Sequence, residues 1–311
     1  MVNITISSAS KPPPFARDWP ITVEAPQDGT IADVKAAIST KYPKFYASRQ
    51  KLSLKNDRKA LSDDKKLSEV LGEKLQGAEL QVKDLGPQVS WRTVFLVEYG
   101  GPLLIHPLFY YFSKFWYGKE VVHSSLQKYV FAFVMLHFIK RELETIFVHR
   151  FSNGTMPIGN IFRNSAHYHI LSGLFLAYDI YRPKYSAASP FIVGTYRNNK
   201  DFLYVAAGLW AFAELSNFHT HMTLRSLRPA GTRTRAIPYG YGFFLVSCPN
   251  YFFEVMGWAI ITGMTNSLAA YLFLAFSAYI MTVWAIKKHK NYRKEFGKDY
   301  PRRKAIWPFI L

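Results

Sequence analysis

The sequence predicts an all-α bundle of about six transmembrane helices preceded by a small α+β domain. Roughly the first 85 of the 311 residues are polar and hold short alternating apolar patterns. The later residues form apolar runs long enough to cross a bilayer, joined by basic segments. The chain is 49% apolar, yet its mean hydropathy is −0.04 because these two unlike parts are averaged. We therefore expect a cytosolic domain over residues 1–85 and a membrane domain over residues 86–311.

The N-terminal segment predicts four strands and one helix. Thr30 is a suitable cap for the helix, whose apolar residues recur at helical spacing, and Asp28-Gly29 offers a turn. The expected elements are the strands Val2–Ser7, Ile21–Glu24, Lys51–Leu54 and Glu79–Val82 and the helix Ile31–Tyr42. This order resembles the ubiquitin-like β-grasp fold, and another small α+β fold is the alternative. No catalytic cluster stands out here, so we expect a docking or regulatory role, with Asp84–Pro87 as the linker.

The apolar runs give approximate bounds for the membrane spans. They lie at about 90–112, 126–148, 165–183, 201–222, 241–263 and 266–286. The joining segment Arg182–Lys200 contains Ser189–Thr195, which is a candidate for a short extra interfacial segment. A count of seven spans is therefore the alternative to six.

Basic residues predict the orientation of these spans. The segments His149–Arg163, Arg225–Arg235 and Lys287–Lys304 are rich in Lys and Arg and fall on one side of a six-span arrangement. The positive-inside rule places that side, and both termini, in the cytosol. The opposite segment after Arg182 is also basic, so the rule is only partly obeyed. The sequons at Asn3 and Asn153 would then face the cytosol and stay unglycosylated.

Composition excludes several classes of protein. The single cysteine, Cys248, excludes an internal disulfide framework. Met1–Ser10 is too polar for the core of a cleavable signal peptide. The net charge of +18 lies beside apolar spans, which favours membrane orientation and anionic ligands over nucleic acid.

The fifth span contains the most unusual polar group. Asn250, Tyr251 and Glu254 follow Pro249 inside an apolar run and would share one helical face. We expect Pro249 to bend the span. Polar side chains are costly in a membrane interior, so this group indicates a functional site. Polar packing between helices is the structural alternative.

Two other spans carry polar stripes. His137, Lys140, Arg141 and Glu144 recur at i, i+3, i+4 and i+7 on one face of the second span. A buried salt-bridge network is the structural alternative to a functional site.

In the fourth span, Glu214, Asn217 and His221 recur on one face, and Arg225 and Arg228 continue it. The arginines could instead extend toward water at the membrane edge. The spacing matches no known zinc motif, so we expect no metal.

These stripes all lie toward the cytosolic ends of their spans. They predict a cavity in the bundle with an arginine-rich mouth, which suits a phosphate-rich ligand. No Gly-x-Gly-x-x-Gly follows a strand, so a soluble Rossmann-type site is not expected, and no Ser/His/Asp or Cys/His set is evident. In the first span, Glu98 is a carboxylate that we expect to face the bundle interior.

An ordered set of motifs carries a family resemblance. The set is NFHTHMTLRSLR at 217–228, AIPYG at 236–240, NYFFE at 250–254, HKNYRKEF at 289–296 and YPRRKAIWPF at 300–309. It resembles the C-terminal domain of the steroid 5α-reductase family. With the β-grasp start, nearly the whole chain is similar to that family's very-long-chain trans-2-enoyl-CoA reductases.

The resemblance implies a multi-pass oxidoreductase of the endoplasmic reticulum that uses NADPH. The implied reaction sends a hydride to the β-carbon and a proton to the α-carbon of a trans-2-enoyl-CoA. It would be the last step of each cycle of very-long-chain fatty acid elongation, which also feeds sphingolipid metabolism. The implied partners are the long-chain enoyl-CoA, membrane lipid and other elongation enzymes, with no nucleic acid.

The resemblance also implies roles for individual residues. Tyr251 matches the proton donor, and Glu98 roughly matches a substrate-facing carboxylate. Lys140 would stabilise the Tyr251 phenolate or, alternatively, polarise the thioester carbonyl. The positions that match or neighbour the family's cofactor contacts are Arg141, Asn217, His221, Arg225, Arg228, Arg235, Asn250, Glu254, Tyr292 and Arg303.

At two positions the chain departs from the steroid reductases. It has His221 where they have Asp, and Phe138 where they tend to have Tyr.

Three other interpretations remain open at this point. One is a steroid or polyprenol 5α-reductase, which Lys140 and Phe138 disfavour. Another is a membrane methyltransferase that uses S-adenosylmethionine. The third is a non-enzymatic membrane subunit of an elongation complex, in which the polar stripes only hold helices together.

Overall fold

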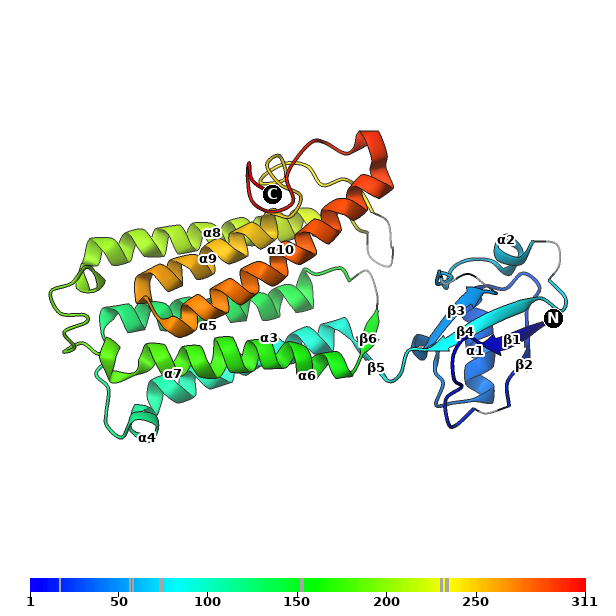
Figure 1. The fold of residues 1–311 in the computed structure, drawn as a ribbon, viewed down its shortest axis with the longest axis horizontal. Helices are drawn as coiled ribbons and strands as arrows, with labels where there is room; N and C mark the ends of the chain where they lie inside the picture. The colour runs from blue at the N-terminus through cyan, green and yellow to red at the C-terminus, as the bar shows by residue number, and fades with distance from the viewer. Residues whose placement is uncertain are drawn as a thin grey trace. The chain divides into compact units, whose positions relative to one another are not determined.

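The computed structural model describes residues 1–16, 18–55, 57, 59–72, 75–151, 154–229, 232 and 235–311 (Figure 1). These residues form two compact units. The first comprises Met1–Ser90 and Asn153–Asn160, and the second comprises Trp91–Ser152 and Ile161–Leu311. The sequon residue Asn153 lies outside the described residues, so the expectation about it is not addressed.

The first unit contains a four-stranded sheet covered by a helix. Its elements are β1 (Val2–Ser8), β2 (Ile21–Ala25), α1 (Ile31–Lys41), η1 (Ala47–Arg49), β3 (Gln50–Leu54), α2 (Leu67–Leu71) and β4 (Glu79–Asp84). The strand order is β2-β1-β4-β3, with β1 and β4 parallel and the outer pairs antiparallel. The predicted order of two strands, a helix and two strands is confirmed.

Alternation of apolar residues builds this sheet. Val2, Ile4 and Ile6 of β1 are buried, and they pack in one core with the buried residues of α1. At the start of α1, Thr30 and Asp33 cap each other's backbone in a capping box. The Thr30 backbone amide and hydroxyl both donate to the Asp33 carboxylate and lower its pKa below the usual value.

The predicted linker starts inside the sheet. Asp84 ends β4 and accepts two hydrogen bonds from the Arg49 guanidinium, at 2.5 and 3.0 Å. Beyond Gly86, the short strand β5 (Gln88–Ser90) pairs antiparallel with β6 (Thr155–Pro157). No sequence pattern predicted this pairing, because both strands have only three residues.

The second unit is a bundle of helices. Its elements are α3 (Trp91–Tyr111), α4 (Ser113–Tyr117), α5 (Ser125–Phe147), α6 (Gly159–Ser165), the π-helix η2 (Ala166–Phe175), α7 (Leu176–Tyr181), η3 (Pro183–Tyr185), η4 (Tyr196–Asn198), α8 (Lys200–Ser226), α9 (Pro249–Thr265), α10 (Leu268–Phe296) and η5 (Gly297–Asp299). Each of the six predicted apolar segments contains helix. In the bundle, α9 packs against both α8 and α10 (Figure 1).

The fifth segment begins later than predicted. Residues 241–248 are not helical, and α9 starts at Pro249. Pro249 therefore opens the helix, where its missing amide costs nothing, and the predicted bend is wrong. Gly240 and Gly242 have φ of 95° and 75°, a conformation that turns the chain before α9. A Cβ on Gly242 would lie 2.7 Å from the Pro249 side chain, so only glycine fits there.

The third segment is irregular and packs tightly against α3. Ala166–Phe175 forms a π-helix, a form often found near functional sites. A Cβ on Gly101 would lie 2.0 Å from the His169 ring. His169 Nε2 in turn bonds the Val97 carbonyl at 2.9 Å. This hydrogen bond ties the π-helix to α3.

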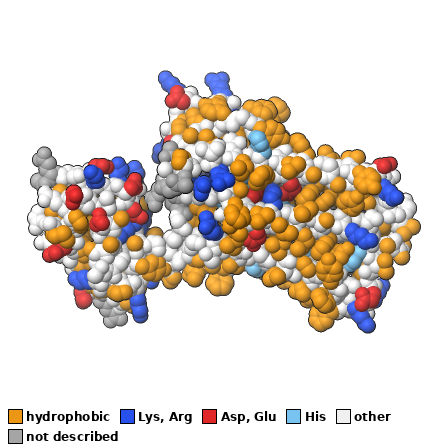
Figure 2. Space-filling view, turned by 180° about the vertical axis from the view of Figure 1, so that it is seen from behind, with side chains coloured by type: hydrophobic (Ala, Val, Ile, Leu, Met, Phe, Trp, Pro, Cys, Tyr) orange, Lys and Arg blue, Asp and Glu red, His pale blue; other side chains and the backbone are white. Residues whose placement is uncertain are grey.

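By length and composition, one helix among the described residues meets a strict criterion for crossing a membrane, and it covers Leu268–Asp299. The six predicted spans are thus not established. Helix α5 does not meet this criterion, because the four ionisable residues of its polar stripe lower its mean hydropathy. Outward-facing residues such as Leu104, Tyr204 and Leu215 are exposed, and Figure 2 shows hydrophobic side chains spread over one face of the helical unit.

Candidate active site

The predicted polar stripes of α5, α8 and α9 meet in the interior of the helical unit. His137, Glu144, Glu214 and His221 are all buried, and Glu254 is 13% exposed. Their spacing places them together because residues at i, i+3, i+4 and i+7 share one face of a helix. Three carboxylates are thereby gathered around cationic side chains in a region with little access to water.

His137 joins two of the carboxylates. Its Nδ1 lies 2.9 Å from Glu214 Oε1 of α8, and its Nε2 lies 3.3 Å from Glu254 Oε1 of α9. The imidazole therefore links α5 to both neighbouring helices. Two carboxylates facing one ring favour its protonated form, because a neutral ring has only one N–H to donate.

Lys140 is held by α8. Its ammonium lies 2.7 Å from Glu214 Oε2 and 2.6 Å from Asn217 Oδ1. It also lies 4.0 Å from Glu144, one turn along α5. The Lys140 ammonium is therefore held by an ion pair with Glu214 and a hydrogen bond with Asn217.

Arg141 faces a different set of partners. Its Nη1 pairs with Glu144 Oε2 at 2.7 Å, and its Nη2 donates to the Tyr99 hydroxyl of α3 at 2.8 Å. Its Nε lies 4.0 Å from Glu254 Oε1. The guanidinium therefore connects α3, α5 and α9. Tyr99 was not among the predicted site residues, although it adjoins Glu98 in the sequence.

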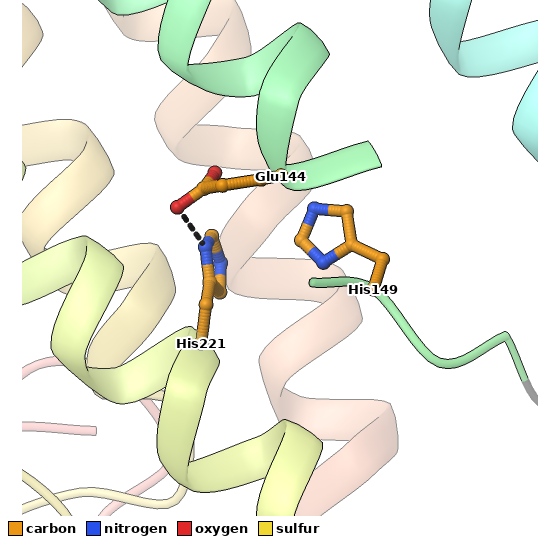
Figure 3. A group of neighbouring side chains, drawn as sticks. All are labelled: Glu144, His149 and His221. Carbon is orange, nitrogen blue, oxygen red and sulfur yellow. Dashed lines mark hydrogen bonds and ion pairs between the residues drawn. The ribbon is translucent and has the colours of Figure 1, made fainter. Parts of the chain in front are cut away.

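Glu144, His149 and His221 form a compact group at the end of this network (Figure 3). Their ligand atoms lie within 4.8 Å of one another, and His221 Nδ1 bonds Glu144 Oε1 at 3.0 Å. Arg141 Nη1 lies 2.7 Å from Glu144, 3.4 Å from His149 and 3.5 Å from His221. A guanidinium thus supplies the positive charge at the position that a metal ion would need, so we assign no metal to this group.

Asn217 connects α8 to α9. Its Nδ2 donates to the Asn250 carbonyl at 2.8 Å and to Glu254 Oε2 at 3.0 Å. The three predicted residues Asn217, Asn250 and Glu254 are therefore brought together.

Tyr251 lies on another side of α9. Its ring packs against the cluster of Cys248, Ala285, Ala305 and Ile306, and it lies 6.3 Å from the Trp284 ring of α10. The cation over its face is Lys288, with Nζ 4.7 Å from the ring centroid. The expected pairing of Tyr251 with Lys140 is therefore wrong. The physical reason is that α9 lies between two helices, so Glu254 faces α8 and Tyr251 faces α10.

Glu98 of α3 is buried at 2% exposure. Its Oε2 has no hydrogen-bond partner in the part of the chain that the structure describes. Burying an unpaired carboxylate oxygen is costly, which is typical of a functional position. Glu98 faces the bundle interior as expected, although no contact joins it to Tyr251 or Lys140 among the described residues.

The predicted arginines lie around the ends of α8 and α10. Arg225 is in the last turn of α8, and Arg228 donates to the Arg150 carbonyl at 2.8 Å. Arg235 pairs with Glu295 of α10 at 3.1 Å. Arg303 binds the carbonyls of Pro238 and Phe243 at 2.8 and 2.6 Å, which fastens the C-terminal segment to the loop before α9.

A second hydrogen-bonded chain adjoins these arginines. Ser247 Oγ lies 2.7 Å from His289 Nδ1 and accepts from the Tyr300 hydroxyl at 2.7 Å. Arg303 Nε donates to that hydroxyl at 3.0 Å, and Tyr292 stacks on the Tyr300 ring at 5.4 Å. Sequence reasoning did not single out Ser247, although His289 and Tyr300 lie within the motifs that carried the family resemblance.

Comparison with known proteins places this architecture in a family. Residues 154–311 match the family described as 3-oxo-5-alpha-steroid 4-dehydrogenase, and residues 23–76 match the domain described as TECR, ubiquitin-like domain. A Schizosaccharomyces pombe protein named as an enoyl reductase is 47% identical over the full length of both chains. The very-long-chain enoyl-CoA reductase of Dictyostelium discoideum is 40% identical, covering 91% of this chain and 92% of its own.

A mouse protein named trans-2,3-enoyl-CoA reductase-like is 35% identical, over 92% of this chain and 78% of its own. These similarities cover the β-grasp unit and the helical unit together. The chain therefore belongs to the 3-oxo-5-alpha-steroid 4-dehydrogenase family, among the very-long-chain enoyl-CoA reductases that carry an N-terminal ubiquitin-like domain.

Proposed function

We propose that this protein reduces the conjugated double bond of a long-chain trans-2-enoyl-CoA, as the last step of fatty acid elongation. The full-length similarity to proteins named as enoyl-CoA reductases carries this proposal. A nicotinamide cofactor supplies the hydride for the β-carbon. The protein has to place a proton on the α-carbon and to offset the negative charge that develops on the thioester oxygen.

Tyr251 is our proposed proton donor. It is half-buried, lies in the NYFFE motif at the start of α9 and has a cation over its ring. Glu98 is our proposed substrate contact, because its buried Oε2 needs a partner that the described residues do not supply. Lys140 and Arg141 would act mainly by holding Glu214, Glu144 and Glu254 in place.

We propose NADPH as the cofactor. Arg303 Nη2 is buried without a hydrogen-bond partner among the described residues, which suits a phosphate oxygen. Arg225, Arg228, Arg235 and Tyr292 would complete the site for the nucleotide. The hydrogen bonds of Asn217 to Asn250 and Glu254 would hold these residues in place beside the nicotinamide.

We further propose a location in the endoplasmic reticulum membrane, with six spans and both termini in the cytosol. The exposed apolar side chains of the helical unit and the long apolar helix α10 support a membrane setting. The ubiquitin-like domain over residues 1–85 would dock other elongation enzymes. The membrane domain over residues 86–311 would carry the chemistry.

The test is oxidation of NADPH by purified protein in detergent, with a long-chain trans-2-enoyl-CoA as substrate. Wild type should turn over, and Tyr251→Phe should lose roughly 100- to 10,000-fold in kcat, the usual range for a general acid. Turnover in both would remove Tyr251 from this role. No turnover in either folded protein would contradict the proposal, and a steroid enone and S-adenosylmethionine would be tried next.

A second measurement separates NADPH from CoA as the ligand of Arg225. Arg225→Ala should raise KM for NADPH and leave KM for the enoyl-CoA unchanged. A rise confined to the enoyl-CoA would reassign this arginine to the CoA phosphates.

A further inference from the structure

One lysine of the last helix is aimed at the predicted proton donor. Met281, Ala285 and Lys288 are spaced at i, i+4 and i+7, so they share one face of α10. Met281 and Ala285 pack in the same cluster as Tyr251. Lys288 Nζ lies 4.7 Å from the centroid of the Tyr251 ring. The position of Lys288 on α10 therefore places its side chain next to Tyr251 of α9.

Lys288 also differs from the other lysine of the site in its partners. In the part of the chain that the structure describes, no carboxylate lies within ion-pair distance of Lys288, whereas Lys140 is paired with Glu214 at 2.7 Å. The positive charge of Lys288 is therefore not neutralised by an acidic neighbour. It is available to a negative charge that appears on Tyr251 during a reaction.

We propose that Lys288 is a positioning residue that orients Tyr251 and stabilises the negative charge left on its oxygen after proton transfer. This inference rests on the proposed function. In the step concerned, the hydride reaches the β-carbon and the nicotinamide is oxidised. The O–H bond of Tyr251 breaks, a C–H bond forms at the α-carbon, and the resulting phenolate later takes a proton from water.

The surroundings strengthen this effect. A cation over an aromatic face is attracted to the neutral ring, and the attraction grows when the ring becomes anionic. Cys248, Ala285 and Ile306 are buried around the phenol and exclude water from one side of it. Charges interact more strongly where water is excluded.

The neighbouring lysine offers a matched control. Lys287 is exposed, as Lys288 is, and lies about 100° away around α10, so it carries the same charge on another face. The experiment compares Lys288→Met, Lys288→Arg and Lys287→Met in the full-length protein in detergent. It measures kcat, KM for the enoyl-CoA, and the solvent isotope effect on kcat in heavy water.

We expect Lys288→Met to lower kcat by about tenfold or more with KM little changed, and to raise the solvent isotope effect because proton transfer becomes slower. Lys288→Arg should restore most of the rate, and Lys287→Met should match wild type. A loss of kcat with an unchanged isotope effect would overturn the proposal, because a structural defect does not single out the proton-transfer step.

The outcomes also separate this inference from the proposed function. If wild type turns over and Tyr251→Phe fails, but Lys288→Met behaves like Lys287→Met, the reductase stands and the role of Lys288 is refuted. If wild type itself does not turn over an enoyl-CoA, the proposed function fails, and with it the role that rests on it.

Discussion

The Asn217 side chain donates to the Glu254 carboxylate across 3.0 Å, and this contact joins α8 to α9. The same nitrogen reaches the Asn250 carbonyl, while the oxygen of the amide accepts from Lys140. The buried amide of Asn217 therefore links α8 to both α5 and α9 through hydrogen bonds. Each end of this amide has partners of the opposite kind, which fixes its orientation.

Replacing Asn217 tests this arrangement. Asn217→Ala should destabilise the protein by about 1–3 kcal/mol, because Lys140 and the Glu254 carboxylate each lose one buried hydrogen bond. Asn217→Asp should be worse, because it adds a fourth carboxylate beside Glu254 and Glu214. Thermal unfolding in detergent measures both. Equal stability of wild type and Asn217→Asp would show that the amide nitrogen is not in contact with Glu254.

The group of Glu144, His149 and His221 gives a prediction about metals. Arg141 Nη1 already contacts all three side chains, so a chelator should leave both turnover and unfolding temperature unchanged. Added zinc should not stabilise wild type. Arg141→Ala is the informative control, since removing the guanidinium leaves a carboxylate and two imidazoles free to bind a divalent ion. Loss of activity in the chelator would instead establish a resident metal.

Several elements were predictable because their causes are local. Period-two alternation at Val2, Ile4 and Ile6 determines which side chains of β1 face the core. The strands and the helix of the first unit were predicted in the correct order. The polar stripes met in the interior because spacing along a helix fixes which residues share a face. The sequence was therefore sufficient to predict that His137, Glu214 and Asn217 lie close together in the bundle interior.

The surroundings of Tyr251 were not predictable in the same way. Spacing shows that Tyr251 and Glu254 are near each other on α9, but not which neighbouring helix each one faces. That depends on how α8 and α10 pack on either side. The start of α9 was also missed, because the apolar run continues through residues 241–248 while the glycines at 240 and 242 turn the backbone.

The capping box of α1 predicts a pH dependence. Asp33→Ala should speed amide hydrogen exchange in α1 at neutral pH, because it removes the carboxylate that receives Thr30. The pKa of Asp33 is lowered in the folded protein, so its stabilising effect is present above the pKa of the unfolded chain and is lost as the pH falls through the folded value. The difference between variant and wild type should therefore shrink in acid.

Asp28→Ala is the control for this measurement, since it removes the same charge just before the cap residue. Exchange in α1 should be close to wild type in that variant. If both substitutions act alike, net charge rather than the cap would be responsible.

Gly101 leaves room for the His169 ring between α3 and the π-helix. A methyl group there would meet the His169 ring at 2.0 Å, so Gly101→Ala has to displace the ring and break its bond to the Val97 carbonyl. We expect a loss of about 1–3 kcal/mol, as in other overpacked interiors. Gly208 in α8 is the matched control, because a Cβ there meets nothing within 4 Å.

Gly208→Ala should stabilise the protein by up to about 1 kcal/mol, through the higher helix propensity of alanine. Thermal unfolding of both variants in one detergent makes the comparison direct. The double variant Gly101→Ala with His169→Ala should lose less than the two single losses add up to, because the clash disappears with the ring. Additive losses would mean that the methyl group is accommodated without moving His169, and that the contact between α3 and the π-helix is looser than the structure indicates.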